Sequence, residues 1–201
     1  MRLTASAVMS RTGFVTGTQQ RGGSLIEVLI SIVIASVALL ALAGINASSV
    51  RYTKMSQYRA TAAQLANDMG ERMRANKGSS VAPTTGFMAG NYDYTTAFSG
   101  QTTKATLPST LCNTSASTCT PAEVAALDLA QWRIIVRDQL PEGSIFILRQ
   151  STEIAVDLWV AWRDPAVAAT DEAPALALEC PNAMNTGGDL SIRCSYFRIN
   201  L

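Results

Sequence analysis

Hydrophobic residues are concentrated in one segment near the amino terminus. After Glu27 no charged residue occurs until Arg51, and residues 28–45 are almost entirely apolar. As a helix these 18 residues would span roughly 27 Å, close to the ~30 Å hydrocarbon core of a bilayer. The pattern therefore predicts a transmembrane helix. A buried core helix is the alternative, and it is disfavoured because the whole run lacks a charge.

A second pattern, with the period of a helix, follows this apolar segment. One helical face collects apolar side chains, namely Tyr58, Ala62, Leu65, Met69 and Met73. Polar residues fill the other faces, and Asp68 and Arg72 form an i,i+4 pair of opposite charge. The sequence Asn-Lys-Gly at 76–78 is typical of a helix end. We expect one long helix over residues 24–77, whose second half, 51–77, lays its apolar face on a folded domain.

The remaining chain, residues 78–201, is expected to form a globular head. Thr120, Pro121 and Glu123 have the spacing of a helix N-cap, a first-turn proline and a capping-box acid. A short helix should therefore begin there and end at about Gln139. Its predicted buried face consists of Leu129, Trp132, Val136 and Leu140, with the tryptophan in the core rather than in a binding site.

After this helix the hydrophobic pattern changes to a period of two, which is typical of strands. It predicts strands at 144–148, 154–162 and 192–201, which form an antiparallel meander on the long helix and give an α+β fold class. Trp159 and the exposed edge of this sheet are candidates for contact with a neighbouring subunit. The Ser- and Thr-rich residues 79–120 are too many for one loop, so they should hold short strands or a functional surface.

Composition and charge limit the possible functions. The chain of 201 residues contains no histidine, which removes the commonest general base, the Ser-His and Cys-His pairs and every His-ligated metal site. No other nucleophile constellation is recognisable, so we expect no enzyme activity, no cofactor and no metal. The net charge of +1 gives no strong attraction to nucleic acid.

The residues ahead of the apolar segment contain a more specific signal. Three arginines and no acid precede Gly23, so the positive-inside rule places the amino terminus in the cytoplasm and the head outside. Glu27 lies a few positions into the helix, where a carboxylate in hydrocarbon costs free energy and needs a partner. A secretory signal cleaved after the apolar run, near 41–49, is an alternative.

The sequence Gln-Arg-Gly-Gly-Ser-Leu-Ile-Glu-Val-Leu-Ile at 20–30 resembles the class III signal of type IV prepilins and pseudopilins. In that family a basic leader ends in glycine, prepilin peptidase cleaves after it, the new amino terminus is N-methylated, and the fifth mature residue is glutamate. The resemblance implies cleavage between Gly22 and Gly23, methylation of Gly23, and Glu27 as the fifth mature residue. The family usually has phenylalanine as its first mature residue, and Gly23 departs from that pattern.

The resemblance also implies a type IV pilin fold, in which the second half of a long amino-terminal helix packs on an antiparallel sheet. The expected divisions are a prepilin leader at 1–22, a transmembrane and filament-core segment at 23–50, the amphipathic half-helix at 51–77 and the head at 78–201. In a filament Glu27 would pair with an amino terminus, its own or a neighbour's, because both charges would otherwise be unpaired at low dielectric. Removing the leader leaves 13 of 16 basic residues against 15 acids, so the mature chain carries a charge of −2.

Further matches resemble the PilV-type minor pilins, also called type IV pilus modification proteins. They are the helix end at 67–76, the segments 128–133 and 140–143, and the tryptophan-containing strand 156–162. The resemblance implies a minor pilin that helps to prime type IV pilus assembly and to display a tip adhesin, and so supports adhesion and twitching motility. The alternatives are a minor pseudopilin of a type II secretion system and, less favoured, a membrane-anchored enzyme.

The same resemblance implies partners and a location. The partners would be prepilin peptidase, other minor pilins, the major pilin and the tip adhesin. The protein would cross the bacterial inner membrane once, with its head in the periplasm, and would reach the pilus tip after assembly.

The four cysteines of the chain are Cys112, Cys119, Cys180 and Cys194. An extracytoplasmic compartment is oxidising and favours disulfides. Of the three possible connectivities we predict the local one, Cys112 with Cys119 and Cys180 with Cys194. A Cys₄ zinc site is disfavoured because the spacings are far from C-x₂₋₄-C.

Acidic residues are clustered late in the chain, at Asp164, Asp171, Glu172, Glu179 and Asp189. They have no EF-hand spacing, so a solvated acidic face is favoured over a calcium loop.

Overall fold

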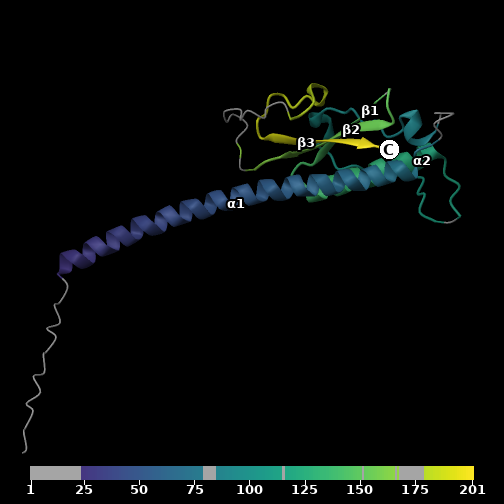
Figure 1. Cartoon of the computed structure of the whole chain (residues 1–201). Helices are drawn as coiled ribbons and strands as arrows, with labels where there is room; N and C mark the ends of the chain where they lie inside the picture. Colours follow the sequence, from purple (N-terminus) through teal and green to yellow (C-terminus); the bar gives the residue numbers. More distant parts are fainter. Residues whose placement is uncertain (1–23, 79–84, 115, 151, 166, 168–178) are drawn as a thin grey trace, which may run out of the picture. The chain divides into compact units, whose positions relative to one another are not determined.

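The computed structural model describes residues 24–78, 85–114, 116–150, 152–165, 167 and 179–201. Its main elements, drawn in Figure 1, are α1 (Leu25–Ala75), α2 (Pro121–Gln139), β1 (Ser144–Arg149), β2 (Ala155–Arg163) and β3 (Ile192–Asn200). Three short 3-10 turns complete them, η1 (Gly86–Ala89), η2 (Phe98–Gln101) and η3 (Asn182–Met184). By its internal contacts the chain divides into two units, Met1–Ala47 and Ser48–Leu201.

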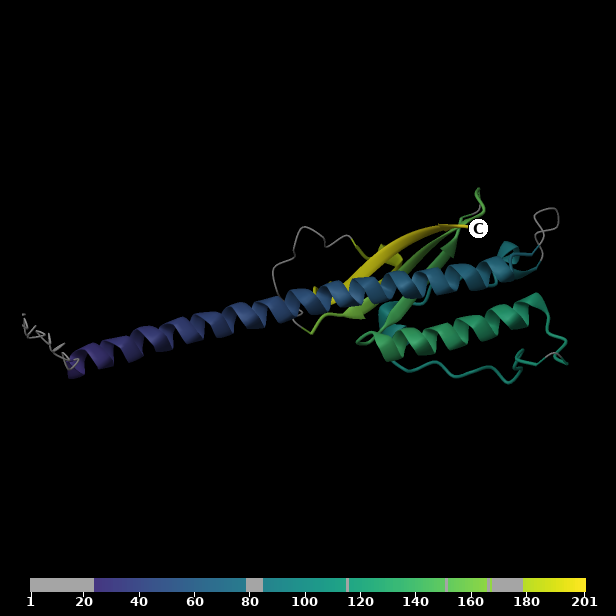
Figure 2. The ribbon, with the colours of Figure 1, turned by 60° about the horizontal axis from the view of Figure 1, so that its bottom comes forward.

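The second unit is built around a three-stranded antiparallel sheet of order β1-β2-β3. The second half of α1 and the whole of α2 lie side by side on one face of this sheet (Figure 2). Tyr94 extends the sheet by one isolated antiparallel bridge to Ile147 of β1. The predicted strands agree with the structure to within about a residue at each end, and the α+β class is confirmed.

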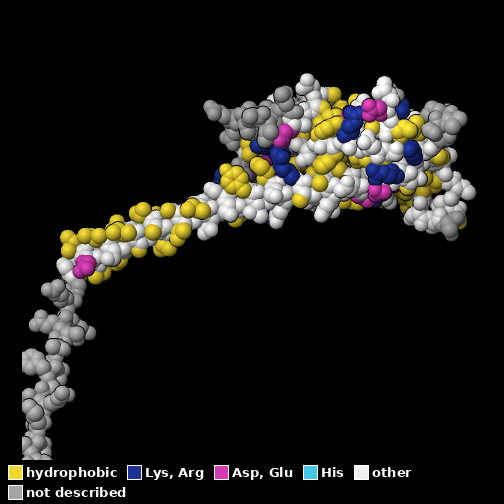
Figure 3. All heavy atoms as spheres, in the orientation of Figure 1, with side chains coloured by type: hydrophobic (Ala, Val, Ile, Leu, Met, Phe, Trp, Pro, Cys, Tyr) yellow, Lys and Arg dark blue, Asp and Glu magenta, His cyan; other side chains and the backbone are white. Residues whose placement is uncertain are grey.

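The first unit contains the beginning of α1, and all of its described residues are exposed. Hydrophobic side chains cover the visible side of this helical segment (Figure 3). α1 is one continuous helix of 51 residues, close to the predicted range of 24–77.

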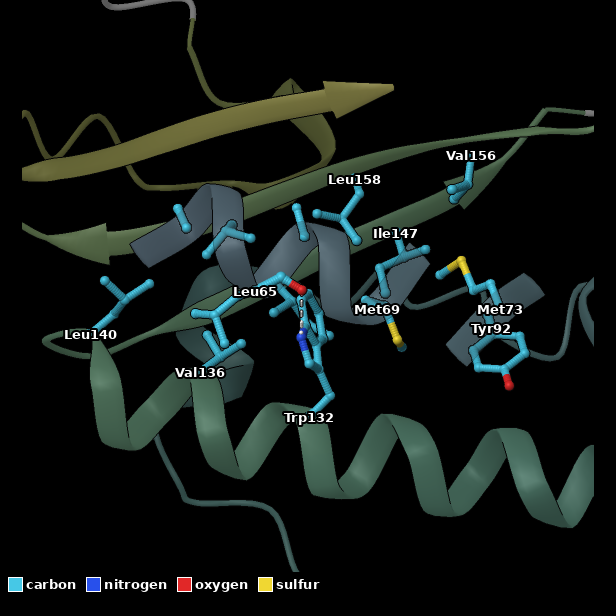
Figure 4. Close-up of a cluster of buried hydrophobic side chains, with 14 of the residues drawn as sticks. Leu65, Met69, Met73, Tyr92, Trp132, Val136, Leu140, Ile147, Val156 and Leu158 are labelled. Carbon is cyan, nitrogen blue, oxygen red and sulfur yellow. Dashed lines mark hydrogen bonds between the residues drawn. The ribbon is translucent and has the colours of Figure 1, made fainter. Parts of the chain in front are cut away.

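The main core lies between the sheet and the two helices. α1 contributes the predicted apolar face, with Ala62, Leu65, Met69 and Met73 at most 4% exposed. The sheet contributes the side chains of one face: Ile145, Ile147, Val156, Leu158, Val160 and Trp162. The close-up in Figure 4 shows Trp132 of α2 reaching across this core toward Leu65. Trp132 is fully buried, as predicted, and so are Val136 and Leu140.

The opposite face of the sheet carries a second, smaller core, which the strand pattern did not predict. It joins the sheet to η2 and η3 through Phe98, Phe146, Ala161, Met184, Ile192 and Cys194. Both faces of β2 are therefore largely buried, and even Asp157 is only 8% exposed. Trp159 lies on this central strand and not at an edge, and it packs between Phe146 and Tyr196 at ring distances of 5.8 and 4.9 Å.

Helix α2 begins as its sequence predicts. The Thr120 hydroxyl accepts a hydrogen bond from the Glu123 amide (3.3 Å), and the Glu123 carboxylate accepts one from the Thr120 amide (2.8 Å). This reciprocal arrangement is the capping box, with Pro121 in the first turn. Hydrogen bonds from the backbone amide and the hydroxyl of Thr120 lower the pKa of Glu123 below its ordinary value.

The segment between the two helices is predicted to hold short strands or a functional surface. Its described residues instead form η1, η2 and the single bridge at Tyr94. Gln101, at the end of η2, is 5% exposed and joins this segment to the start of β1. Side-chain to backbone bonds thus replace the expected strand pairing.

Candidate assembly and processing site

The described chain begins at Ser24, the second residue after the predicted cleavage position. The backbone carbonyl of Ser24 accepts hydrogen bonds from the amides of Glu27 (2.9 Å) and Val28 (3.3 Å), so the first helical turn forms at once. Gly22 and Gly23 lie outside the described residues, and their roles in cleavage and methylation stay predictions.

Glu27 is the only charged residue between positions 24 and 50. Glu27 is exposed. Within the described chain its carboxylate accepts no hydrogen bond and forms no ion pair. Its backbone carbonyl accepts a bond from the Ser31 hydroxyl at 2.7 Å. The carboxylate is therefore available to a cationic group from elsewhere, which pairing with an amino terminus requires.

The helix around Glu27 exposes apolar side chains along its whole length. From Leu25 to Ile45 every Leu, Ile and Val side chain is between 51% and 85% exposed. Among the described residues α1 is the one helix long and apolar enough to cross a membrane, and its most apolar stretch is not buried at all. A monomeric soluble protein rarely exposes so continuous an apolar surface, so this segment requires lipid or other protein around it.

Three hydroxyl groups of α1 form hydrogen bonds within the helix itself. Ser31, Ser36 and Thr53 each donate to the backbone carbonyl four residues earlier, those of Glu27, Ile32 and Ser49. Such back-bonding is how serine and threonine are accommodated in membrane helices. Both the apolar surface and these bonds fit membrane anchoring through α1.

In the head, a polar network joins α1 to α2 beside the main core. Arg72 donates to Asp68 (3.0 Å), Asp128 (3.1 Å) and Gln131 (3.1 Å). The predicted i,i+4 pair of Arg72 with Asp68 is present, and the bonds to α2 add to it. The buried phenol of Tyr92 donates to the second carboxylate oxygen of Asp128 at 2.7 Å.

Tyr92 is held neutral by this environment. Burial, and then the hydrogen bond to Asp128, raise the pKa of its phenol well above the ordinary value, although the Asn76 amide works in the opposite direction. The sequence does not reveal this network, because Tyr92 and Asp128 are 36 positions apart. Its sequence signal is Asp128, the one charged residue in the otherwise apolar run 124–130.

Two disulfides join the cysteines. Cys112 is bonded to Cys119 and Cys180 to Cys194, which are the two local pairs, and no described cysteine is free. The first closes an exposed loop just before α2. The second joins the segment before η3 to the third residue of β3, Cys194, which is only 2% exposed within the smaller core.

The late acidic residues do not form one site. Glu179 pairs with Arg59 of α1 at 2.8 Å, and the Asp189 carboxylate accepts bonds from Arg163 and Ser191. The Ser191 hydroxyl and then Arg163 lower the pKa of Asp189. Asp164 is only 3% exposed, so the predicted solvated face is wrong for this residue.

The other two members of that acidic group, Asp171 and Glu172, lie outside the described residues. Among the residues that the structure describes, no three acidic or cysteine side chains are grouped as metal ligands.

A comparison with known protein families gives an independent result for the amino-terminal segment. Residues 17–43 match the prokaryotic N-terminal methylation motif, which is typical of type IV pilins and pseudopilins. No curated protein and no solved structure showed significant similarity to the chain. The motif implies processing by prepilin peptidase and association with pilus components, and it is typical of structural subunits rather than enzymes.

Proposed function

We propose that this protein is a type IV pilus subunit, made as a prepilin, inserted with its amino terminus in the cytoplasm, cleaved after Gly22 and methylated at Gly23. The observation that carries the proposal is the methylation motif at 17–43, which runs directly into an exposed apolar helix containing Glu27. Neither feature has a use in a soluble enzyme or binding module, whereas a pilin needs both.

The helix then serves in two environments. In the inner membrane its apolar side chains contact lipid, and in the filament they contact the helices of other subunits. The transfer exchanges one apolar environment for another and therefore costs little hydrophobic free energy. The Glu27 carboxylate is the exception, because it must be compensated in the filament by an amino terminus.

Within the pilus we assign the chain to the minor pilins, of the PilV type. In this role it joins other minor pilins in a complex that primes assembly, contacts the major pilin and helps to display a tip adhesin, and so supports adhesion and twitching motility. The head, outside the cytoplasm, is the part that would contact these partners. The protein performs no catalysis and needs no cofactor in this role.

The test uses the full-length gene expressed in a piliated host. Gly22→Leu should leave the leader attached, because a bulky side chain blocks the peptidase position. Glu27→Ala should be cleaved normally and remain in the membrane but enter pili poorly. Ser31→Ala is the matched control and should behave as wild type, because it removes only a hydroxyl bonded within the helix.

Intact-mass measurement reports leader removal, one added methyl group and both disulfides in one experiment. Normal mass and normal piliation in both Gly22→Leu and Glu27→Ala would contradict the proposal. Deleting the gene separates the pilus from the secretion alternative. Loss of pili and twitching supports a minor pilin, whereas loss of secreted enzymes with intact pili supports a minor pseudopilin.

A further inference from the structure

Arg133 of α2 is one of several cationic side chains in the described head that form no ion pair, and it also donates no hydrogen bond. In the segment 128–133 the polar groups of Asp128, Gln131 and Trp132 all form hydrogen bonds to α1 or to a residue beside it. The guanidinium of Arg133 instead lies over the ring of Tyr94, 4.4 Å from its centroid. Within the described chain no acceptor receives a hydrogen bond from Arg133, so its donors are free to bind a ligand.

Arg133 lines an open pocket between α2, the start of β1 and the segment after η2. The polar lining consists of Gln101, Thr103, Lys104, Arg133, Arg137 and Ser144. Three of these side chains are cations. Lys104 is neutralised by Asp138, whose two carboxylate oxygens accept its hydrogen bonds at 2.6 and 2.7 Å. The three cations and Asp138 together carry a charge of +2.

The walls of the pocket are fixed in place by hydrogen bonds. The Gln101 amide donates to the Ile145 carbonyl at 2.8 Å, and the Ile145 amide donates back to the Gln101 side chain at 3.0 Å. Arg137 donates to the Thr102 carbonyl at 2.7 Å and so ties the 102–105 segment to α2. Because these hydrogen bonds are all internal to the head, little ordering of the pocket walls is needed when a ligand binds.

Arg133 and Arg137 are one helical turn apart on α2, and such like charges repel each other. An anion between them would remove the repulsion. A planar guanidinium held over an aromatic ring presents its donors in the fork geometry that carboxylates and phosphates match. The enclosed part of the pocket is small, which suits one compact group rather than a nucleotide.

We propose that this pocket binds a compact oxyanion, a carboxylate or a phosphate group, with Arg133 as the hydrogen-bond donor and Lys104 and Arg137 supplying charge. Thr103 offers a further hydroxyl at the rim. The site does not depend on the pilus function, because it is formed entirely within the second unit and far along the chain from the methylation motif.

Isothermal titration calorimetry on the purified full-length chain in detergent tests the proposal. The two probes are inorganic phosphate and an N-acetylated glutamate amide, each titrated at constant ionic strength against a chloride reference. Wild type should bind at least one of them. Tighter binding of the glutamate probe points to a protein carboxylate as the natural ligand, and tighter binding of phosphate points to a free or lipid-borne phosphate.

Arg133→Gln should weaken binding at least tenfold, and Arg133→Lys should retain part of it because the charge remains. Arg198→Gln is the matched control, since Arg198 is an exposed arginine paired with Glu153 outside the pocket. If Arg133→Gln proves unstable by thermal unfolding, Lys104→Gln is used instead, and it should also weaken binding of the probe. No heat with either probe in wild type, or equal weakening in Arg198→Gln, would overturn the site.

Discussion

The indole nitrogen of Trp132 donates a hydrogen bond to the backbone carbonyl of Leu65 at 3.0 Å. The bond joins the middle of α2 to the amphipathic half of α1, and both residues lie in the main core, at 0% and 4% exposure. In Figure 4 it runs across the space between the two helices. A buried indole N–H without an acceptor would be costly, so this bond fixes the position at which α2 crosses α1.

Removing the donor while keeping most of the ring should therefore destabilise the head. Trp132→Phe should lower the free energy of unfolding by about 2–4 kcal/mol, because the smaller ring leaves a cavity and the Leu65 carbonyl loses a partner. Urea unfolding of the full chain in detergent, followed by near-ultraviolet circular dichroism, measures this. Trp159→Phe is the control, since Trp159 is only partly buried and its indole forms no hydrogen bond within the described residues. Equal losses in the two variants would show that the bond to Leu65 contributes nothing specific.

The raised pKa of the Tyr92 phenol predicts how the stability of the fold changes at alkaline pH. Its pKa is raised by burial first and then by the hydrogen bond to Asp128, so the folded state holds the proton more tightly than the unfolded state does. The stabilisation is complete below the unfolded pKa of about 10 and is lost as the pH rises from there toward the folded pKa.

Tyr92→Phe has no phenol to titrate. The stability difference between wild type and this variant should therefore be constant up to about pH 9 and should shrink between pH 9 and 11. Unfolding curves at three pH values in that range provide the measurement. A difference that stays constant to pH 11 would mean that the phenol is not held neutral by the fold.

The disulfides should differ in their effect on stability. In the chain-entropy model each short loop contributes roughly 2–3 kcal/mol. Replacing Cys180 and Cys194 by serine should cost more than replacing Cys112 and Cys119, because Cys194 is buried in the smaller core and Cys180 packs against it, so a hydroxyl at 194 would be buried. Thermal unfolding of the two double variants compares them, with the reduced wild type as reference. A greater loss from the Cys112 and Cys119 variant would contradict the assigned packing.

Local sequence signals predicted most of the fold. The capping box at Thr120 and Glu123 depends on residues three positions apart, and the apolar face of α1 depends on intervals of three and four. Each pattern is complete within its own element. For this reason the bounds of α2 and the three strands agreed closely with the structure.

The features that the sequence did not reveal depend on distant loops. The smaller core forms because η2 and η3 fold over the sheet, so Phe98 and Met184 cover Phe146 and Ala161. No period in the strand indicates that its second face will be covered. The same holds for Arg133, whose contact with Tyr94 joins positions separated by an irregular segment. The candidate processing site, in contrast, is continuous in sequence, and the match at 17–43 supported it directly.

The turn that ends α1 depends on a glycine, Gly78, and substitution of this residue tests how much the turn contributes to stability. Gly78 has a φ of 80°, and a Cβ added there would lie 2.3 Å from the Thr85 carbonyl oxygen. Gly78→Ala should therefore lower the stability of the head by about 1–3 kcal/mol, through left-handed strain and the clash together. Gly44→Ala is the matched control, because Gly44 lies inside α1 and a Cβ there meets nothing within 4 Å. It should leave the urea midpoint of the head unchanged while raising the helical signal of the first unit. A Gly78→Ala midpoint equal to that of Gly44→Ala would show that the chain can leave α1 by a different turn.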